Sequence, residues 1–191
     1  MHPLIARLDR WLQANRLTYH ASLQPGASSD VIDEIARRAG GELPALLREL
    51  LTWRDGQPDD SDDHLEHLWS LMSARTILDT LDDMAWLVEN DDFAGLWGDG
   101  WVPFLGNIYG DHLCVDTAGG PGGAPGQIIE FKAEDHHRYI RYPSLEAWLE
   151  TLVSAFEAGL SGDDSNPDDR EAYEAFVARR HPGYPIARAM T

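Results

Sequence analysis

The sequence has few basic residues and many acidic ones. Its 15 Lys and Arg stand against 33 Asp and Glu, so the formal net charge is −18. A surface of this sign repels the phosphates of nucleic acids and the headgroups of anionic lipids. We therefore expect no direct binding to nucleic acid and no binding to membranes.

Cysteine and long apolar runs are also scarce. The single cysteine, Cys114, cannot form an internal disulfide, and its setting in the run His-Leu-Cys-Val indicates a strand interior. The first residues carry a charge every few positions, which is not the pattern of a signal peptide or a membrane span. These absences predict a reducing compartment and a cytoplasmic protein.

The remaining composition is that of a folded protein. Of the 191 residues, 43% are hydrophobic and 9% aromatic, and this length suits one compact domain better than two. We predict a single domain over residues 1–160, followed by an acidic linker and a C-terminal helix over residues 161–191. That helix either packs on the domain or extends to a partner.

Apolar spacing separates helical from extended segments. Apolar residues recur at helical spacing in the opening residues and again after Ser28, after Pro44, after Thr76 and after Ser144. A last helix is predicted from its start signals instead: Asn166 as the cap, Pro167 at the first position and acidic residues in the first turn. Strand-like runs cover residues 68–72, 101–105, 113–116, 127–131 and 138–142. The last four runs are bounded by Gly, Asp or Pro. The pattern predicts an α+β fold with an antiparallel meander.

Several short motifs follow one another in a recognisable order. Leu43-Pro44 precedes an apolar helix that ends at Asp55-Gly56, and a Trp101-Val-Pro-Phe-Leu-Gly strand follows. A strand from Gly110 to Asp116, a Gly-Gln-Ile-Ile strand and a closing Ser-Leu-Glu-Ala-Trp-Leu helix complete the series. Together these motifs, from Asp30 to Phe156, resemble the SUKH superfamily, which includes the fungal SMI/KNR-type cell-wall regulators.

The resemblance carries expectations about fold and function. It implies a twisted, mainly antiparallel sheet flanked by helices, with no catalytic residues and no cofactor. Bacterial members of the superfamily are mostly immunity proteins that bind and neutralise a toxin domain, often a nuclease. We therefore expect a non-catalytic domain whose protein partner is a basic toxin, with an SMI/KNR-type regulatory scaffold in cell-wall or signalling control as the alternative.

Candidate metal and catalytic groups have simpler interpretations. His64 and His67 lie three residues apart beside acidic residues, but without a third ligand a solvated loop is the better interpretation. The acidic run lacks the glycine and the closing glutamate of a calcium loop in register. Asp111, Asp116 and His136-His137 would serve an enzyme only if they met in one pocket, and turn or strand-end roles suit both aspartates better.

The predicted binding surface combines acidic and aromatic residues. Four of the seven tryptophans fall on apolar faces, whereas Trp53 and Trp97 are candidates for exposed contact area. The full set of predicted surface residues is Trp53, Asp59, Asp60, Asp62, Asp63, Trp97, Asp111 and Asp116. No metal site is included.

Overall fold

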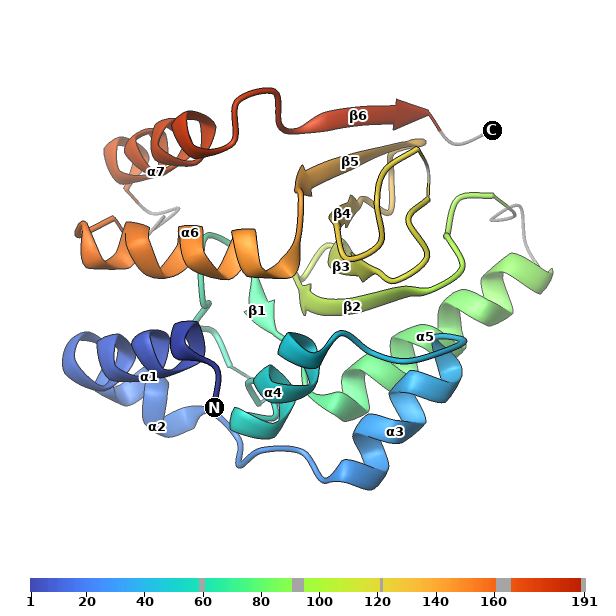
Figure 1. Ribbon diagram of the computed structural model, residues 1–191, viewed down its shortest axis with the longest axis horizontal. Helices are drawn as coiled ribbons and strands as arrows, with labels where there is room; N and C mark the ends of the chain where they lie inside the picture. Colours follow the sequence, from blue (N-terminus) through green and yellow to red (C-terminus); the bar gives the residue numbers. More distant parts are fainter. Residues whose placement is uncertain (59–60, 91–94, 121, 161–165, 190–191) are drawn as a thin grey trace.

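The computed structural model describes residues 1–58, 61–90, 95–120, 122–160 and 166–189. These residues form seven helices and one six-stranded sheet (Figure 1). The helices are α1 (Pro3–Asn15), α2 (Leu17–Ser22), α3 (Ser29–Arg38), α4 (Ala45–Trp53), α5 (Ala74–Asn90), α6 (Leu145–Glu157) and α7 (Pro167–Arg180). The strands are β1 (Ser70–Leu71), β2 (Trp101–Gly106), β3 (His112–Asp116), β4 (Ile128–Phe131), β5 (His137–Tyr142) and β6 (Ile186–Ala189).

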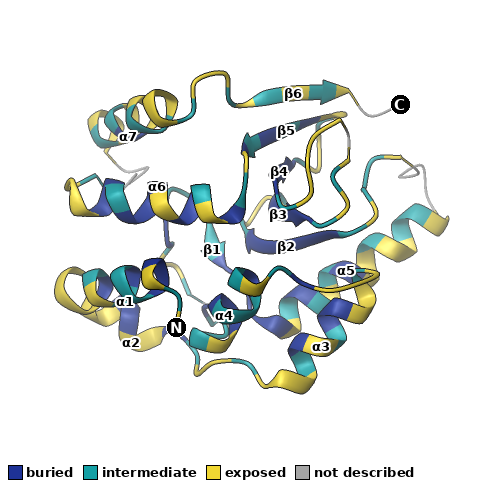
Figure 2. Cartoon of the chain, in the orientation of Figure 1, coloured by how far each residue is buried: buried dark blue, intermediate teal, exposed yellow. Residues whose placement is uncertain are grey.

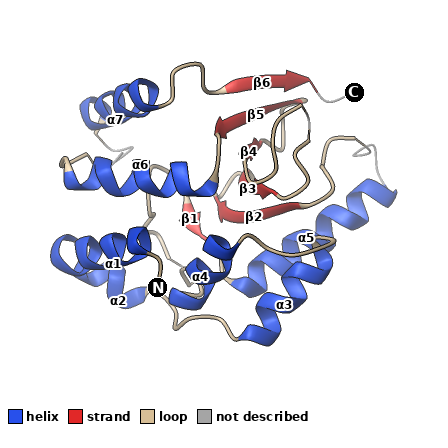
Figure 3. Ribbon diagram, in the orientation of Figure 1, coloured by secondary structure: helices blue, strands red, loops and turns tan. Residues whose placement is uncertain are grey.

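The sheet is a meander, as the sequence predicted. Its strand order follows the chain from β1 to β6, and each strand pairs antiparallel with the next (Figure 3). The α+β class and the antiparallel sheet are therefore confirmed. Sequence spacing placed the four central strands to within one or two residues.

Helix α6 is the centre of the hydrophobic core. Ser144 begins it, because its hydroxyl accepts a hydrogen bond from the Ala147 amide, which no helical carbonyl can satisfy. The helix contacts α1, α4, α7 and β5, so it has little exposed surface (Figure 2). Its buried apolar residues include all six that the helical spacing predicted, namely Leu145, Trp148, Leu149, Leu152, Val153 and Phe156.

The two faces of the sheet carry separate apolar clusters. Leu113 and Val115 of β3 join the large cluster that includes α6. Cys114, between them, joins a smaller cluster on the other face with Trp101 and Phe131. This division follows from the alternation of side chains along a strand. It also explains the burial of the lone cysteine, whose thiol pKa is raised by desolvation, so it is not a reactive thiolate.

The Asp55-Gly56 pair has a clear structural role. An oxygen of the Asp55 carboxylate lies 2.5 Å from the Ala74 amide nitrogen and so caps the start of α5. Gly56 has φ +68°, and a Cβ there would come within 2.5 Å of the Met72 carbonyl carbon. Aspartate followed by glycine thus lets the end of α4 lie directly against the segment that joins β1 to α5.

The segment after residue 165 is part of the same structure. Helix α7 packs on α6, its Tyr173 is 3% exposed, and β6 pairs with β5 along its whole length. The predicted C-terminal helix is thus present, and of its two alternatives the structure shows the one in which it packs on the domain. Neither β6 nor α2 was predicted, because both are short and carry too few apolar residues to show a period.

Candidate functional site

Two cavities flank the segment around β1, on opposite faces of the sheet. His112 of β3 lines one of them and its neighbour Leu113 lines the other, and adjacent strand residues point to opposite faces. Their volumes are about 520 Å³ and about 370 Å³. We name the larger the tyrosine pocket and the smaller the hydroxyl pocket, after the side chains that distinguish them.

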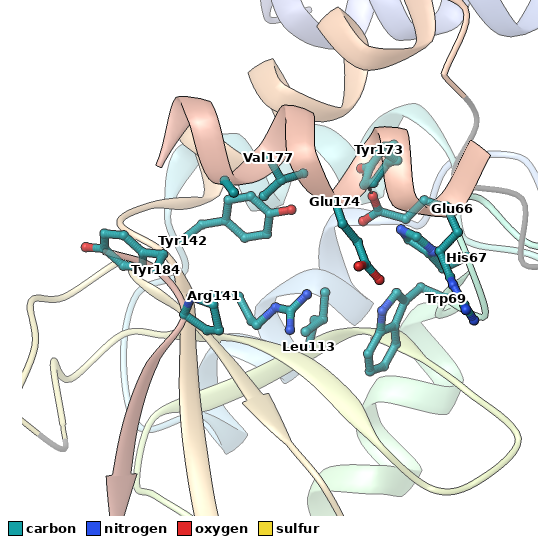
Figure 4. A pocket seen from close by; sticks show the side chains of 13 residues that line it. Glu66, His67, Trp69, Leu113, Arg141, Tyr142, Tyr173, Glu174, Val177 and Tyr184 are labelled. Atoms are coloured by element: carbon teal, nitrogen blue, oxygen red, sulfur yellow. Dashed lines mark hydrogen bonds between the residues drawn. The ribbon is translucent and has the colours of Figure 1, made fainter. Parts of the chain in front are cut away.

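The tyrosine pocket lies between α7 and the sheet (Figure 4). It contains three tyrosines, Tyr142 from β5, Tyr173 from α7 and Tyr184 from the segment before β6. Charged side chains of both signs also line it, among them Arg141, Arg170 and Glu174. The remaining lining residues are Glu66, His67, Trp69, Leu113, Val177, Ala178 and Pro185.

A buried carboxylate holds one end of the tyrosine pocket together. Glu66 is 4% exposed, and its Oε1 accepts a hydrogen bond from the Trp148 indole at 2.7 Å. Its Oε2 accepts a second, short hydrogen bond from the Tyr173 hydroxyl. Burial, and then the Glu66 charge, raise the pKa of Tyr173 well above its ordinary value. The Tyr173 phenol therefore stays protonated and acts as a donor, not as a base. Through its two hydrogen bonds, the Glu66 carboxylate connects α7 to α6.

The hydroxyl pocket is bounded by the loop before β1, the first turns of α5 and the β2–β3 hairpin. Five hydroxyl side chains line it: Ser61, Ser70, Ser73, Thr76 and Thr80. Its other lining residues are Gln57, Pro58, His64, Leu71, Met72, Gly106, Asn107, Ile108 and His112. None of these described residues is a lysine, arginine, aspartate or glutamate, although a quarter of the whole chain is charged.

Gln57 fixes one wall of the hydroxyl pocket. Its Oε1 accepts hydrogen bonds from the Tyr19 hydroxyl and the Leu71 amide, each at 2.9 Å, and its Nε2 donates to the Asp63 carbonyl. The Gln57 amide also donates to the Leu71 carbonyl. These bonds cover the outer edge of β1 and hold the acidic loop against it.

His112 is the exception in this hydrogen-bonded wall. The side chain is 9% exposed, and its Nδ1 is buried with no hydrogen-bond partner among the described residues. The ring stacks on Phe131 with a centroid distance of 6.0 Å. Burial lowers the His112 pKa to about 4, against the opposing charge of Asp111, so the imidazole is neutral at pH 7.

Three of the predicted acidic residues lie around the mouth of the hydroxyl pocket. Asp62 and Asp63 are exposed between the lining residues Ser61 and His64, and Asp63 also forms an ion pair with Arg16 at 2.5 Å. Asp111 is in the β2–β3 hairpin, where it accepts hydrogen bonds from the Asn107 side chain and the Ala133 amide. Asp59 and Asp60 lie outside the described residues.

The other predicted surface residues do not join them. Asp116 is fully buried, and its carboxylate accepts hydrogen bonds from the Ala118 and Gly119 amides and the Gln127 side chain. It therefore organises the glycine-rich turn after β3 and is not a surface residue, contrary to the prediction. Trp53 is half-buried, with its indole donating to Asp9. Trp97 is half-buried against Trp101 and Phe131 on the sheet.

The metal and acid–base alternatives gain no support from the geometry. Within the described ranges, no three His, Cys, Asp or Glu side chains are grouped closely enough to hold a metal ion. Asp111, Asp116 and the His136-His137 pair line neither of the two cavities. Among the described residues, no helix is long and apolar enough to cross a membrane.

Comparison with known families identifies the fold. The SMI1/KNR4 family (SUKH-1) matches residues 26–151. The chain belongs to the SMI1/KNR4 family. The resemblance found in the motifs from Leu43-Pro44 to Trp148 is thus confirmed, and the whole hydroxyl pocket lies within the matched segment.

Fungal members of the SMI1/KNR4 family are among the relatives. A protein of Schizosaccharomyces pombe named cell wall biosynthesis/cell cycle regulator smi1 is 24% identical over 188 residues, which cover 84% of this chain and 37% of the relative. KNR4/SMI1 homolog 2 of Debaryomyces hansenii is 34% identical over 70 residues, which cover 37% of this chain and 12% of the relative. The chain thus spans only a minor part of these SMI1/KNR4 proteins.

The two cavities differ in how much of their lining lies within the family-matched segment. Arg170, Tyr173, Glu174 and Tyr184 of the tyrosine pocket follow the matched segment. In contrast, residues 57–112 supply every described lining residue of the hydroxyl pocket.

Sequence reasoning missed His112 and the exposed hairpin residues Ile108 and Tyr109. The signal for the hairpin pair was present, because two large apolar residues stand in a turn where polar residues are usual.

Proposed function

We propose that this chain is a non-catalytic protein-binding domain of the immunity type, which binds a basic toxin domain and blocks its active site. The observation that carries the proposal is the combination of SMI1/KNR4 family membership with a net charge of −18. A toxin that acts on nucleic acid needs a positive active-site surface, which a negative protein surface complements. A nuclease-type toxin is the class that fits best.

Exposed apolar side chains supply the contact that charge alone does not provide. Ile108 is 83% exposed and Tyr109 is 64% exposed, side by side in the β2–β3 hairpin beside Asp111. Interfaces gain most of their affinity from a few buried aromatic or aliphatic anchors, whereas peripheral charges mainly accelerate association. Both kinds of group occur together at the mouth of the hydroxyl pocket.

A regulatory scaffold is the second candidate function. It is favoured by the name of the S. pombe relative, a cell wall biosynthesis/cell cycle regulator, although this chain matches only 37% of that protein. A scaffold would hold several cellular proteins, whereas an immunity protein needs one cognate toxin. The number of specific partners therefore separates the two functions.

Co-expression tests the proposal. Toxin-like reading frames beside the gene are expressed in cells with and without this chain, and growth is measured. We expect the chain to restore growth against one of them, and purified proteins to associate more slowly as salt rises from low to physiological concentration. Failure to protect against any neighbouring toxin, together with capture of several unrelated cellular proteins, would favour the scaffold.

A further inference from the structure

We propose that the hydroxyl pocket receives an arginine side chain of the basic partner, and that His112 Nδ1 is one of its hydrogen-bond acceptors. The inference rests on the proposed function, because it specifies the contact by which the domain would hold that partner. It concerns an uncharged cavity with acidic residues around its mouth.

The unpartnered His112 nitrogen is the first argument for an occupant. A buried polar atom without a partner costs about 1–3 kcal/mol, and a ligand that donates a hydrogen bond to it removes that cost. The space next to this atom is kept open by Gly106, where a Cβ would lie 3.4 Å from His112 Nδ1 and 3.4 Å from Met72 Sδ. Both His112 and Gly106 line the cavity, and Nδ1 is itself buried, directly behind the wall at Gly106.

The chemistry of the lining favours a hydrogen-bond donor. A neutral imidazole with its proton on Nε2 presents Nδ1 as an acceptor. The hydroxyl oxygens of Ser70 and Thr80 are further acceptors in the same cavity, whereas the Asn107 side-chain oxygen already accepts hydrogen bonds from the Tyr109 and Asp111 amides. No lysine or arginine is among the described lining residues, so this wall carries no guanidinium or ammonium group that would repel a positive ligand.

Arginine fits this cavity better than lysine does. Its three-carbon stem can pack on Leu71, Met72 and Ile108, while five N–H donors reach the polar wall. A guanidinium is also more weakly hydrated than an ammonium, so its transfer into an uncharged pocket costs less. The exposed Asp62 carboxylate at the mouth attracts either cation and repels acidic side chains, whereas the Asp63 carboxylate is paired with Arg16.

Short peptides on the full chain test the inference directly. Acetyl-Gly-Arg-Gly-amide is titrated into ¹⁵N-labelled protein, beside the lysine peptide and a citrulline peptide of the same shape without the charge. We expect the arginine peptide to shift the amide signals of Gly106, Asn107 and His112, with an affinity at least about tenfold above that of citrulline, which corresponds to one charge-assisted hydrogen bond. Equal binding of citrulline, or shifts confined to other surfaces, would overturn the inference.

Two variants locate the contact, and a third is the matched control. His112→Phe keeps the ring on Phe131 but removes the acceptor, and Gly106→Ala places a methyl group beside Nδ1. Each is expected to weaken arginine-peptide binding about tenfold. His137→Phe removes an imidazole that is exposed on β5 and should leave binding unchanged. If His112→Phe binds the peptide as wild type does, the acceptor role is wrong.

The inference and the proposed function fail in different ways. If the chain protects cells from a toxin but no arginine peptide binds the hydroxyl pocket, the inference is wrong and the immunity function stands. If the peptide binds as described but no toxin is neutralised, the immunity function is wrong and the pocket remains an arginine site.

Discussion

The two cavities beside β1 differ in whether their buried polar groups are paired. In the tyrosine pocket, both oxygens of Glu66 accept hydrogen bonds, one from Trp148 and one from Tyr173. In the hydroxyl pocket, the buried Nδ1 of His112 has no partner in the described part of the chain. The first arrangement holds helices to one another, whereas the second leaves a buried atom unpaired at the wall of a cavity.

The comparison separates stability from binding. Residues after the family-matched segment build much of the tyrosine pocket, and their bonds attach α7 and β6 to the domain. The hydroxyl pocket lies within the matched segment, opens beside exposed Ile108 and Tyr109, and has acidic residues around its mouth. Substitutions in the tyrosine pocket should therefore change the free energy of unfolding, and substitutions in the hydroxyl pocket should change partner affinity.

Loss of the Glu66 carboxylate should produce the largest effect. Glu66→Ala leaves the Trp148 indole and the Tyr173 hydroxyl buried without an acceptor, so we expect the free energy of unfolding to fall by about 4 kcal/mol. Urea unfolding measures the change. Glu66→Gln retains one acceptor oxygen and should lose less. Equal stability of wild type and Glu66→Ala would show that this carboxylate does not hold α7 to α6.

Acid should destabilise the protein through His112. Because burial lowers its pKa to about 4 from the ordinary 6.5, the unfolded chain binds more protons than the folded chain between these values. His112 thus contributes stability at neutral pH that is lost as the pH falls from 6.5 through 4, up to about 3 kcal/mol.

The His112→Phe variant isolates this contribution. At pH 7 its free energy of unfolding should equal or exceed that of wild type, because a buried unpaired nitrogen is removed. At pH 5 the variant should exceed wild type by a larger margin, because only wild type loses stability as the imidazole takes up a proton. Thermal or urea unfolding at both pH values provides the comparison. A pH dependence identical in the two proteins would contradict the assignment of a buried neutral imidazole.

Removal of a single hydroxyl from the tyrosine pocket should have the smallest effect on stability. The Glu66 carboxylate accepts hydrogen bonds from the Tyr173 hydroxyl and the Trp148 indole. Tyr173→Phe keeps the ring but removes the first of these two donors, so we expect the free energy of unfolding to fall by about 2 kcal/mol. Amide hydrogen exchange should rise most in α7, because this bond attaches that helix. Unchanged exchange in α7 would show that apolar packing alone holds the helix.

The sequence predicted the core of this fold because periodic burial is a local signal. The apolar stripe of α6 and the alternation along β3 are visible in consecutive residues. The strand β6 was missed because its Ile-Ala-Arg-Ala sequence becomes a strand only through pairing with β5, a tertiary contact.

The candidate site was less accessible to sequence reasoning. The acidic residues were predicted as surface from their charge. This is correct for Asp62 and Asp63 but fails for Asp116, whose buried carboxylate holds the amides of the turn that follows β3. The hydroxyl pocket brings Gln57, Thr80 and His112 together from separate segments. An unpartnered nitrogen is a property of that arrangement and has no signature in sequence.

The most direct test of this division measures the affinity of the toxin identified by co-expression for variants of both cavities. We expect His112→Phe and Gly106→Ala in the hydroxyl pocket to weaken the complex about tenfold, and Tyr173→Phe in the tyrosine pocket to leave its dissociation constant within about twofold of wild type. Weakened binding by Tyr173→Phe, with His112→Phe and Gly106→Ala indistinguishable from wild type, would contradict the account.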